Sequence, residues 1–218
     1  MAARSHATLR GKYDQAMAEL RFTLPIVAII FLYTWVLAPR TPRSVSPLVT
    51  FLVLALSIWR AVRTGEWGLR RSALWPALRG AAAFTLPTVL VLCVVGSTLG
   101  AVPRRANPWG DLAFLLPWAA GQQFALQTVL LREAQAATSR RQGILLAAAV
   151  FGALHLPNPF LAPVTLVAAL AWCWIYDRHP NLLPLALSHA FCTLAILYCF
   201  DPKITGRLRV GYSYLQLQ

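Results

Sequence analysis

Several polar side chains lie within otherwise apolar stretches of the sequence, and these residues are the best placed to do chemistry. Two of them are histidines, His155 and His189. The others are three amides and a hydroxyl, namely Gln122, Gln123, Gln127 and Thr193. Because polar groups are costly in a hydrocarbon environment, residues of this kind are candidates for a functional site.

These residues can meet at one level of a helical bundle. Counted at about 1.5 Å per residue from the presumed cytoplasmic helix ends, Gln122 lies about 14 Å deep, His155 about 18 Å and His189 about 10 Å. Gln123 and Gln127 share one side of a helix with Gln122, because steps of four and five residues return close to the starting face. Three segments therefore bring polar groups to a shared layer, which predicts a site between helices.

A purely structural role is the alternative for the same residues. Glutamine and histidine side chains can hydrogen-bond across helices and hold a membrane bundle together, contributing about 0.6 to 2 kcal/mol each. For any one of these residues alone we would favour that role. The convergence of three segments is what favours a site.

The sequence gives little support for a metal or a disulfide framework. Two histidines without a carboxylate or thiolate partner make an incomplete zinc site, so we expect no metal and no other cofactor. The cysteines show no C-x-x-C spacing, and we expect them to pack as small hydrophobic thiols. They are Cys93, Cys173, Cys192 and Cys199, all in apolar stretches.

The segments that carry these residues are long and apolar. The chain is 58% hydrophobic and 12% charged, whereas soluble domains carry about 25% charged residues. The apolar runs are 22–38, 46–59, 82–102, 109–131, 143–156, 158–176 and 182–200. We therefore predict an all-α, polytopic transmembrane helical bundle with about seven spans, of which the second and fifth runs are short for a full crossing.

The predicted organisation is one membrane domain with two flanking segments. Residues 1–21 form a cytoplasmic N-terminal segment, residues 22–200 the transmembrane helical domain and residues 201–218 a C-terminal tail. The longest predicted loop, 60–81, holds Trp67 and Trp75 among arginines. That composition predicts a segment lying on the membrane surface.

The net charge of +13 comes from basic residues that lie between the apolar runs. No basic stretch has the interleaved aromatic residues of a stacking platform, so we expect no nucleic-acid partner. With the N-terminus in the cytoplasm, 13 of the 20 basic residues fall inside and 7 outside, as the positive-inside rule expects. We therefore expect a multi-pass protein of the cell inner membrane, in contact with lipid, with a cytoplasmic N-terminus.

Three motifs follow one another along the second half of the chain. They are Gln122-Gln123-x-x-x-Gln127, then Phe151-x-x-x-His155 followed by Leu156-Pro157-Asn158-Pro159, then Asn181 to His189 with Thr193 four residues later. In this order they resemble the CPBP group of intramembrane endopeptidases, which includes the type II CAAX prenyl endopeptidases and the lysostaphin-resistance-protein-A-like proteins. That family carries E-E-x-x-x-R, F-x-x-x-H and H-x-x-x-N or H-x-x-x-D. The resemblance covers a core at about residues 109–200.

The resemblance implies a hydrolytic site. In the family pattern a glutamate and the F-x-x-x-H histidine activate a water, while the last histidine and the asparagine stabilise the oxyanion. Carried over to this chain, His155 would act as the base and His189 with Thr193 would donate hydrogen bonds.

The first motif departs from the family at every defining position. Gln122 and Gln123 stand where the family has its glutamates, and Gln127 stands where it has its arginine. A glutamine carbonyl can orient a water but does not usefully accept its proton, and loss of a general base costs about 10²- to 10⁴-fold in rate. Asp111 and Glu133 do not substitute, because each lies eleven residues from Gln122 and thus about 16 Å along the helix axis.

Two functions from different classes follow from this pattern. The first is an intramembrane endopeptidase that processes the C-terminal or membrane-embedded tail of a protein substrate. The alternative is a non-catalytic scaffold or chaperone, a pseudoprotease that binds a partner's helix, in which the neutral glutamines replace a charged cluster without leaving an unpaired charge. A small transporter is a third alternative, which only the prolines within the apolar runs favour.

Overall fold

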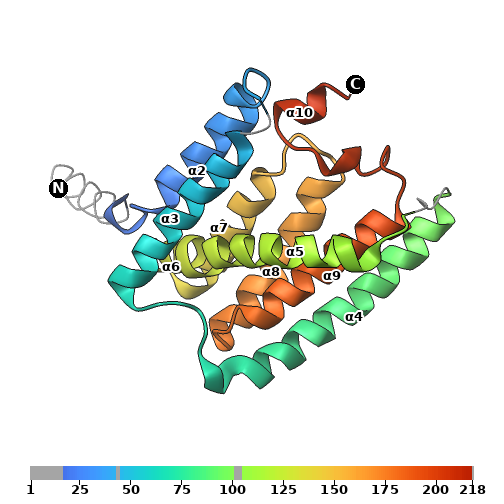
Figure 1. Cartoon of the computed structure of the whole chain (residues 1–218). Coiled ribbons are helices and arrows are strands. Elements are labelled where there is room, and N and C mark those ends of the chain that lie inside the picture. The colour runs from blue at the N-terminus through green and yellow to red at the C-terminus, as the bar shows by residue number, and fades with distance from the viewer. Residues whose placement is uncertain (1–16, 43–44, 101–104, 218) are drawn as a thin grey trace, which may run out of the picture.

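The chain folds as a bundle of helices (Figure 1). The computed structural model describes residues 17–42, 45–100 and 105–217. Within them the only strand-like contact is one isolated bridge, between Leu69 and Asn181. Residues 1–16 of the predicted N-terminal segment 1–21 lie outside the described residues. The basic residues Arg43 and Arg104 also lie outside them.

The helices follow one another with short connections. The first half contains α2 (Thr23–Leu32), the π-helical η1 (Tyr33–Leu37), α3 (Ser46–Thr64), the short η3 (Arg71–Ala73) and α4 (Leu74–Thr98). The second half contains α5 (Pro108–Phe124), the π-helical η4 (Ala125–Leu131), α6 (Arg132–Ala137), α7 (Arg140–Ala153), α8 (Leu161–Arg178) and α9 (Leu183–Cys199). The tail adds η5 (Gly206–Leu208) and α10 (Tyr212–Leu215).

The prediction of an all-α fold is confirmed, and each of the seven apolar runs coincides with a helical segment. Two helices, Ser46–Thr64 and Arg71–Thr98, are long and apolar enough to cross a membrane. Thr23–Leu37 and Leu183–Cys199 are apolar but shorter. The count of about seven spans therefore stays a prediction.

The predicted surface loop 60–81 is wrong in its extent. Helix α3 continues to Thr64 and ends where Gly65 adopts a left-handed conformation, with φ of 72°, as is common at helix C-termini. Only residues 65–70 are left between it and η3. The error arose from Arg60, a charge that suggested a loop but that is buried and ion-paired inside the bundle.

Helix starts follow from local capping groups. Asn107 accepts a hydrogen bond from the backbone of Gly110 at the start of α5, where Pro108 occupies the first turn. Ser139 caps α7 in the same way through the backbone of Gln142. Side-chain oxygens at these positions satisfy N–H groups that a helix leaves unpaired.

The segment Pro108–Ala137 forms the spine of the bundle, because α5, η4 and α6 follow one another without a break. Along its length it contacts α9, then α3, then α7. Helix α4 lies along α9, α7 lies along α8, and α2 and α3 form a hairpin on the opposite side (Figure 1). The outward side of α4 exposes Leu86, Leu90 and Val91, an apolar surface that suits contact with lipid.

A buried carboxylate joins the hairpin to the spine. Glu133 of α6 accepts hydrogen bonds from the backbone N–H groups of Phe22 (3.1 Å) and Thr23 (2.8 Å), at the start of α2. It also forms an ion pair with Arg60 of α3 at 3.4 Å. Arg60 in turn donates to the carbonyl of Thr128 in η4. This network holds α2 and α3 against the spine. The cavity described below lies between the α2–α3 hairpin and the spine.

Candidate functional site

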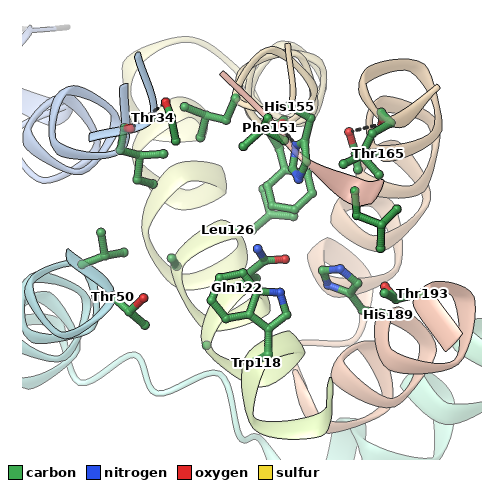
Figure 2. A pocket seen from close by; sticks show the side chains of 18 of the residues that line it. Thr34, Thr50, Trp118, Gln122, Leu126, Phe151, His155, Thr165, His189 and Thr193 are labelled. Atoms are coloured by element: carbon green, nitrogen blue, oxygen red, sulfur yellow. Dashed lines mark hydrogen bonds between the residues drawn. The ribbon is translucent and has the colours of Figure 1, made fainter. Parts of the chain in front are cut away.

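A cavity of about 430 Å³ lies between the α2–α3 hairpin, the spine and the helices α7, α8 and α9. Its walls are mainly apolar, as is usual for ligand sites with a few polar groups. The candidate residues that line it are Gln122, His155, His189 and Thr193 (Figure 2). The structure therefore brings together groups from α5, the end of α7 and α9.

The three glutamines do not share one environment. Gln122 is part-exposed and lines the cavity, whereas Gln123 and Gln127 are fully buried behind it. The expectation that all three face one side is thus wrong. Gln122 and Gln123 are neighbours on α5, so about 100° of helical rotation separates their side chains. Gln127 lies four residues after Gln123 and hydrogen-bonds to it on the buried side.

The two buried glutamines form a chain of hydrogen bonds to His189. The Gln127 Nε2 donates to Gln123 Oε1 at 2.9 Å, and the Gln123 Nε2 lies 3.4 Å from His189 Nδ1. Because an amide nitrogen can only donate, Nδ1 accepts, and the proton of the neutral ring lies on Nε2. The Gln127 Oε1 is buried with no hydrogen-bond partner among the described residues.

The His189 ring is also held by an aromatic contact. It stacks on Trp172 with ring centroids 4.6 Å apart and an interplanar angle of 29°. Trp172 Nε1 donates to the hydroxyl of Ser188 at 2.9 Å, and Thr85 hydrogen-bonds the same hydroxyl at 2.6 Å. These contacts orient His189. Ser188 lies within the third motif, beside His189, whereas no motif in the sequence indicated Trp172 or Thr85.

His155 has the opposite polarity. Its Nδ1 lies 2.7 Å from the carbonyl oxygen of Phe151, one helical turn earlier. A carbonyl only accepts, so Nδ1 carries the proton and Nε2 is left as an acceptor. The carbonyl is available because α7 ends here and the His155 backbone N–H turns to Gly152 instead. The F-x-x-x-H spacing thus has a direct structural reason.

Phe151 links the two histidines. Its ring centroid lies 4.9 Å from that of His155 and 6.3 Å from that of His189. Gln122 faces the space beside them, and Thr193 lies next to His189 (Figure 2). An acceptor nitrogen and a donor nitrogen on the walls of one cavity can position a water and polarise a carbonyl.

Carboxylates have other partners. Among the described residues no Asp or Glu lines the cavity. Glu133 is engaged by the α2–α3 hairpin, and Asp111 pairs with Arg105 at 3.0 Å and with the Tyr198 hydroxyl at 3.0 Å. This agrees with the expectation that neither replaces a glutamate beside Gln122. No three His, Cys, Asp or Glu side chains of the described segments gather as a metal site.

The C-terminal tail contributes to the cavity, which the sequence did not indicate. Leu208 and Val210 line it. The buried amide of Asn158 holds this part of the tail by donating to the carbonyls of Thr205 (2.9 Å) and Arg209 (3.0 Å). Asn158 lies three residues after His155, so its position in the Leu156–Pro159 segment was the one available signal.

Comparisons with known proteins identify one family. A family model described as "Type II CAAX prenyl endopeptidase Rce1-like" matches residues 49–195, which is more than half of the chain. The match begins in α3 and ends in α9, so it includes every residue of the three motifs. No curated protein and no solved structure matches the chain.

Proposed function

We propose a function that starts from the family: the chain belongs to the Rce1-like family of type II CAAX prenyl endopeptidases. This membrane-embedded protein binds the C-terminal or membrane-embedded tail of a protein substrate and hydrolyses a peptide bond within it. The observation that carries the proposal is the pair of histidines on the walls of one apolar cavity, one held as an acceptor and the other as a donor. An apolar cavity open beside exposed apolar helices suits a tail that arrives from the lipid.

The proposed chemistry uses the four candidate residues that line the cavity. A water hydrogen-bonded to Gln122 transfers its proton to His155 Nε2 as its oxygen attacks the scissile carbonyl carbon. The Nε2–H of His189 and the hydroxyl of Thr193 donate to the oxyanion that develops. The C–N bond then breaks, and the proton on His155 passes to the leaving amine. Gln123 and Gln127 position His189 and do not touch the substrate.

The absence of a carboxylate from the lining of the described cavity sets the expected rate. A histidine alone replaces the glutamate and histidine of the family pattern, which lowers the rate by about 10²- to 10⁴-fold. We therefore propose a slow enzyme.

A second candidate is a non-catalytic membrane scaffold or chaperone that retains the cavity and binds a partner's helix. One observation favours it. All three motif positions that carry charge in the family pattern carry neutral amides here, and two of them hydrogen-bond to each other. In that case the amides complete a neutral polar wall.

The location and organisation of the protein are part of the proposal. We place it in the cell inner membrane with a cytoplasmic N-terminus, because 13 of its 20 basic residues then fall on the cytoplasmic side. Residues 1–21 then form the cytoplasmic segment, 22–200 the transmembrane domain and 201–218 a tail that covers one end of the cavity.

The two candidates differ in turnover. Purified protein in liposomes is incubated with a tail-anchored or prenylated peptide, and the products are identified by mass spectrometry. Cleavage that His155→Ala abolishes supports the enzyme. Binding without cleavage, together with cleavage gained in Gln122→Glu, supports the scaffold.

A further inference from the structure

Two cysteines from different helices meet at one end of the bundle. Cys93 lies in α4, and Cys199 is the last residue of α9. Their Sγ atoms lie 2.9 Å apart although the residues are 106 positions apart in sequence. Since a disulfide bond is about 2.05 Å long, its formation requires the sulfur atoms to move by roughly 0.9 Å.

The two helices also approach each other closely beside this pair. Gly96 lies almost one turn after Cys93 on α4, and a Cβ added there would clash with the carbonyl group of Cys199. The missing side chain lets α4 and α9 come together at this point. Disulfides require short Cα and Cβ separations, which a close approach of the two helices favours.

This pair differs from the other two cysteines in its accessibility. Cys93 and Cys199 are part-exposed, whereas Cys173 and Cys192 are buried. The pair also lies at a polar end of the bundle, because Tyr198 hydrogen-bonds Asp111, which pairs with Arg105. Cys93 lies within the last two turns of α4 and Cys199 is the last residue of α9, so an oxidant at the membrane surface can reach the two thiols.

We propose that Cys93 and Cys199 form an intramolecular disulfide that ties the end of α9 to α4. The two thiols lose two protons and two electrons to a small-molecule or protein disulfide, which is reduced to two thiols. The bridge restrains α9, the helix that carries His189 and Thr193. Under the proposed orientation this end of the bundle lies on the side of the membrane opposite the cytoplasm. Disulfides persist outside the cytoplasm, where the surroundings are oxidising.

The test uses the full-length protein in detergent micelles. The protein is reduced, freed of reductant, treated with diamide, alkylated and digested with trypsin without further reduction. Cleavage after Arg79, Arg104, Arg178 and Lys203 places Cys93 and Cys199 on separate peptides. We expect these two peptides to be joined, with the loss of two hydrogen atoms from the intact mass.

Three variants assign the bond. Cys192 lies on the same tryptic peptide as Cys199, so Cys192→Ser is the matched control and should keep the joined peptides. Cys93→Ser and Cys199→Ser should each abolish them. Two freely alkylated thiols at Cys93 and Cys199 in folded, diamide-treated wild type would overturn the proposal, as would joined peptides that depend on Cys192. The wild-type result stands even if a variant fails to fold.

Discussion

The buried carboxylate of Glu133 offers the clearest test of how the bundle is held together. Its side chain is 5% exposed and its partner Arg60 is 9% exposed. Glu133→Ala removes the ion pair and both hydrogen bonds to the start of α2. Breaking a buried pair costs about 3–5 kcal/mol. We expect a cost of about 4 kcal/mol, below the upper end of that range. The cost is reduced because Arg60 keeps Glu66 at 3.6 Å and the Thr128 carbonyl as partners.

Glu133→Gln should cost less than Glu133→Ala. The amide keeps one acceptor oxygen, and hydrogen bonds to a neutral acceptor are weaker by about 1 kcal/mol than those to a charged one, so we expect a loss of about 2 kcal/mol. The matched control is Arg140→Gln, which breaks the ion pair to Asp177 at an arginine side chain that is 66% exposed. Its expected cost is below about 1 kcal/mol.

The measurement is the free energy of unfolding of each variant in mixed micelles, from titration with a denaturing detergent. Circular dichroism reports the loss of helix. The reasoning is refuted if Glu133→Ala unfolds within about 1 kcal/mol of wild type, or if Arg140→Gln is the more damaging change.

Two further predictions concern the cavity. Gln122→Glu restores a carboxylate on its wall and should raise the rate of tail cleavage by about 10²-fold, measured by single-turnover assay in liposomes; no increase in a folded variant would argue against a water at this position. Gly211→Val should loosen the tail, because Gly211 has φ of 58° and a Cβ there would clash with Thr34. We expect tryptic cleavage at Arg209 to be about tenfold faster, for a local cost of about 1.4 kcal/mol. Gly65→Val, at φ of 72° with no atom near its Cβ, is the control and should leave that cleavage unchanged.

The features of the fold that depend on local composition could be predicted from the sequence. Apolar runs of helix length gave the helices and their order, and the spacing of Phe151 and His155 anticipated one turn of α7. Helix ends marked by charge could not be predicted, because Arg60 is neutralised by Glu133, a residue 73 positions later that the fold alone brings near. The π-helical segment η4 likewise left no pattern in hydrophobicity.

The residues that line the candidate site could be predicted from the sequence, but the residues that hold them in place could not. Gln122, His155, His189 and Thr193 line one cavity, but the roles of Gln123 and Gln127 depend on contacts with His189 and with each other that only the fold brings about. The stacking of Trp172 on His189 and the return of Leu208 and Val210 to the cavity are long-range contacts. Periodicity along the chain carries no information about them.

The central claim is that the cavity between His155 and His189 cleaves a substrate tail. The most direct measurement is mass-spectrometric detection of peptide products from a tail-anchored or prenylated peptide, with wild type and His155→Ala in matched liposomes. The account predicts slow cleavage by wild type and none by His155→Ala, with peptide binding retained by both. Cleavage that persists at the wild-type rate in His155→Ala, or wild type that cleaves no such peptide, would contradict it.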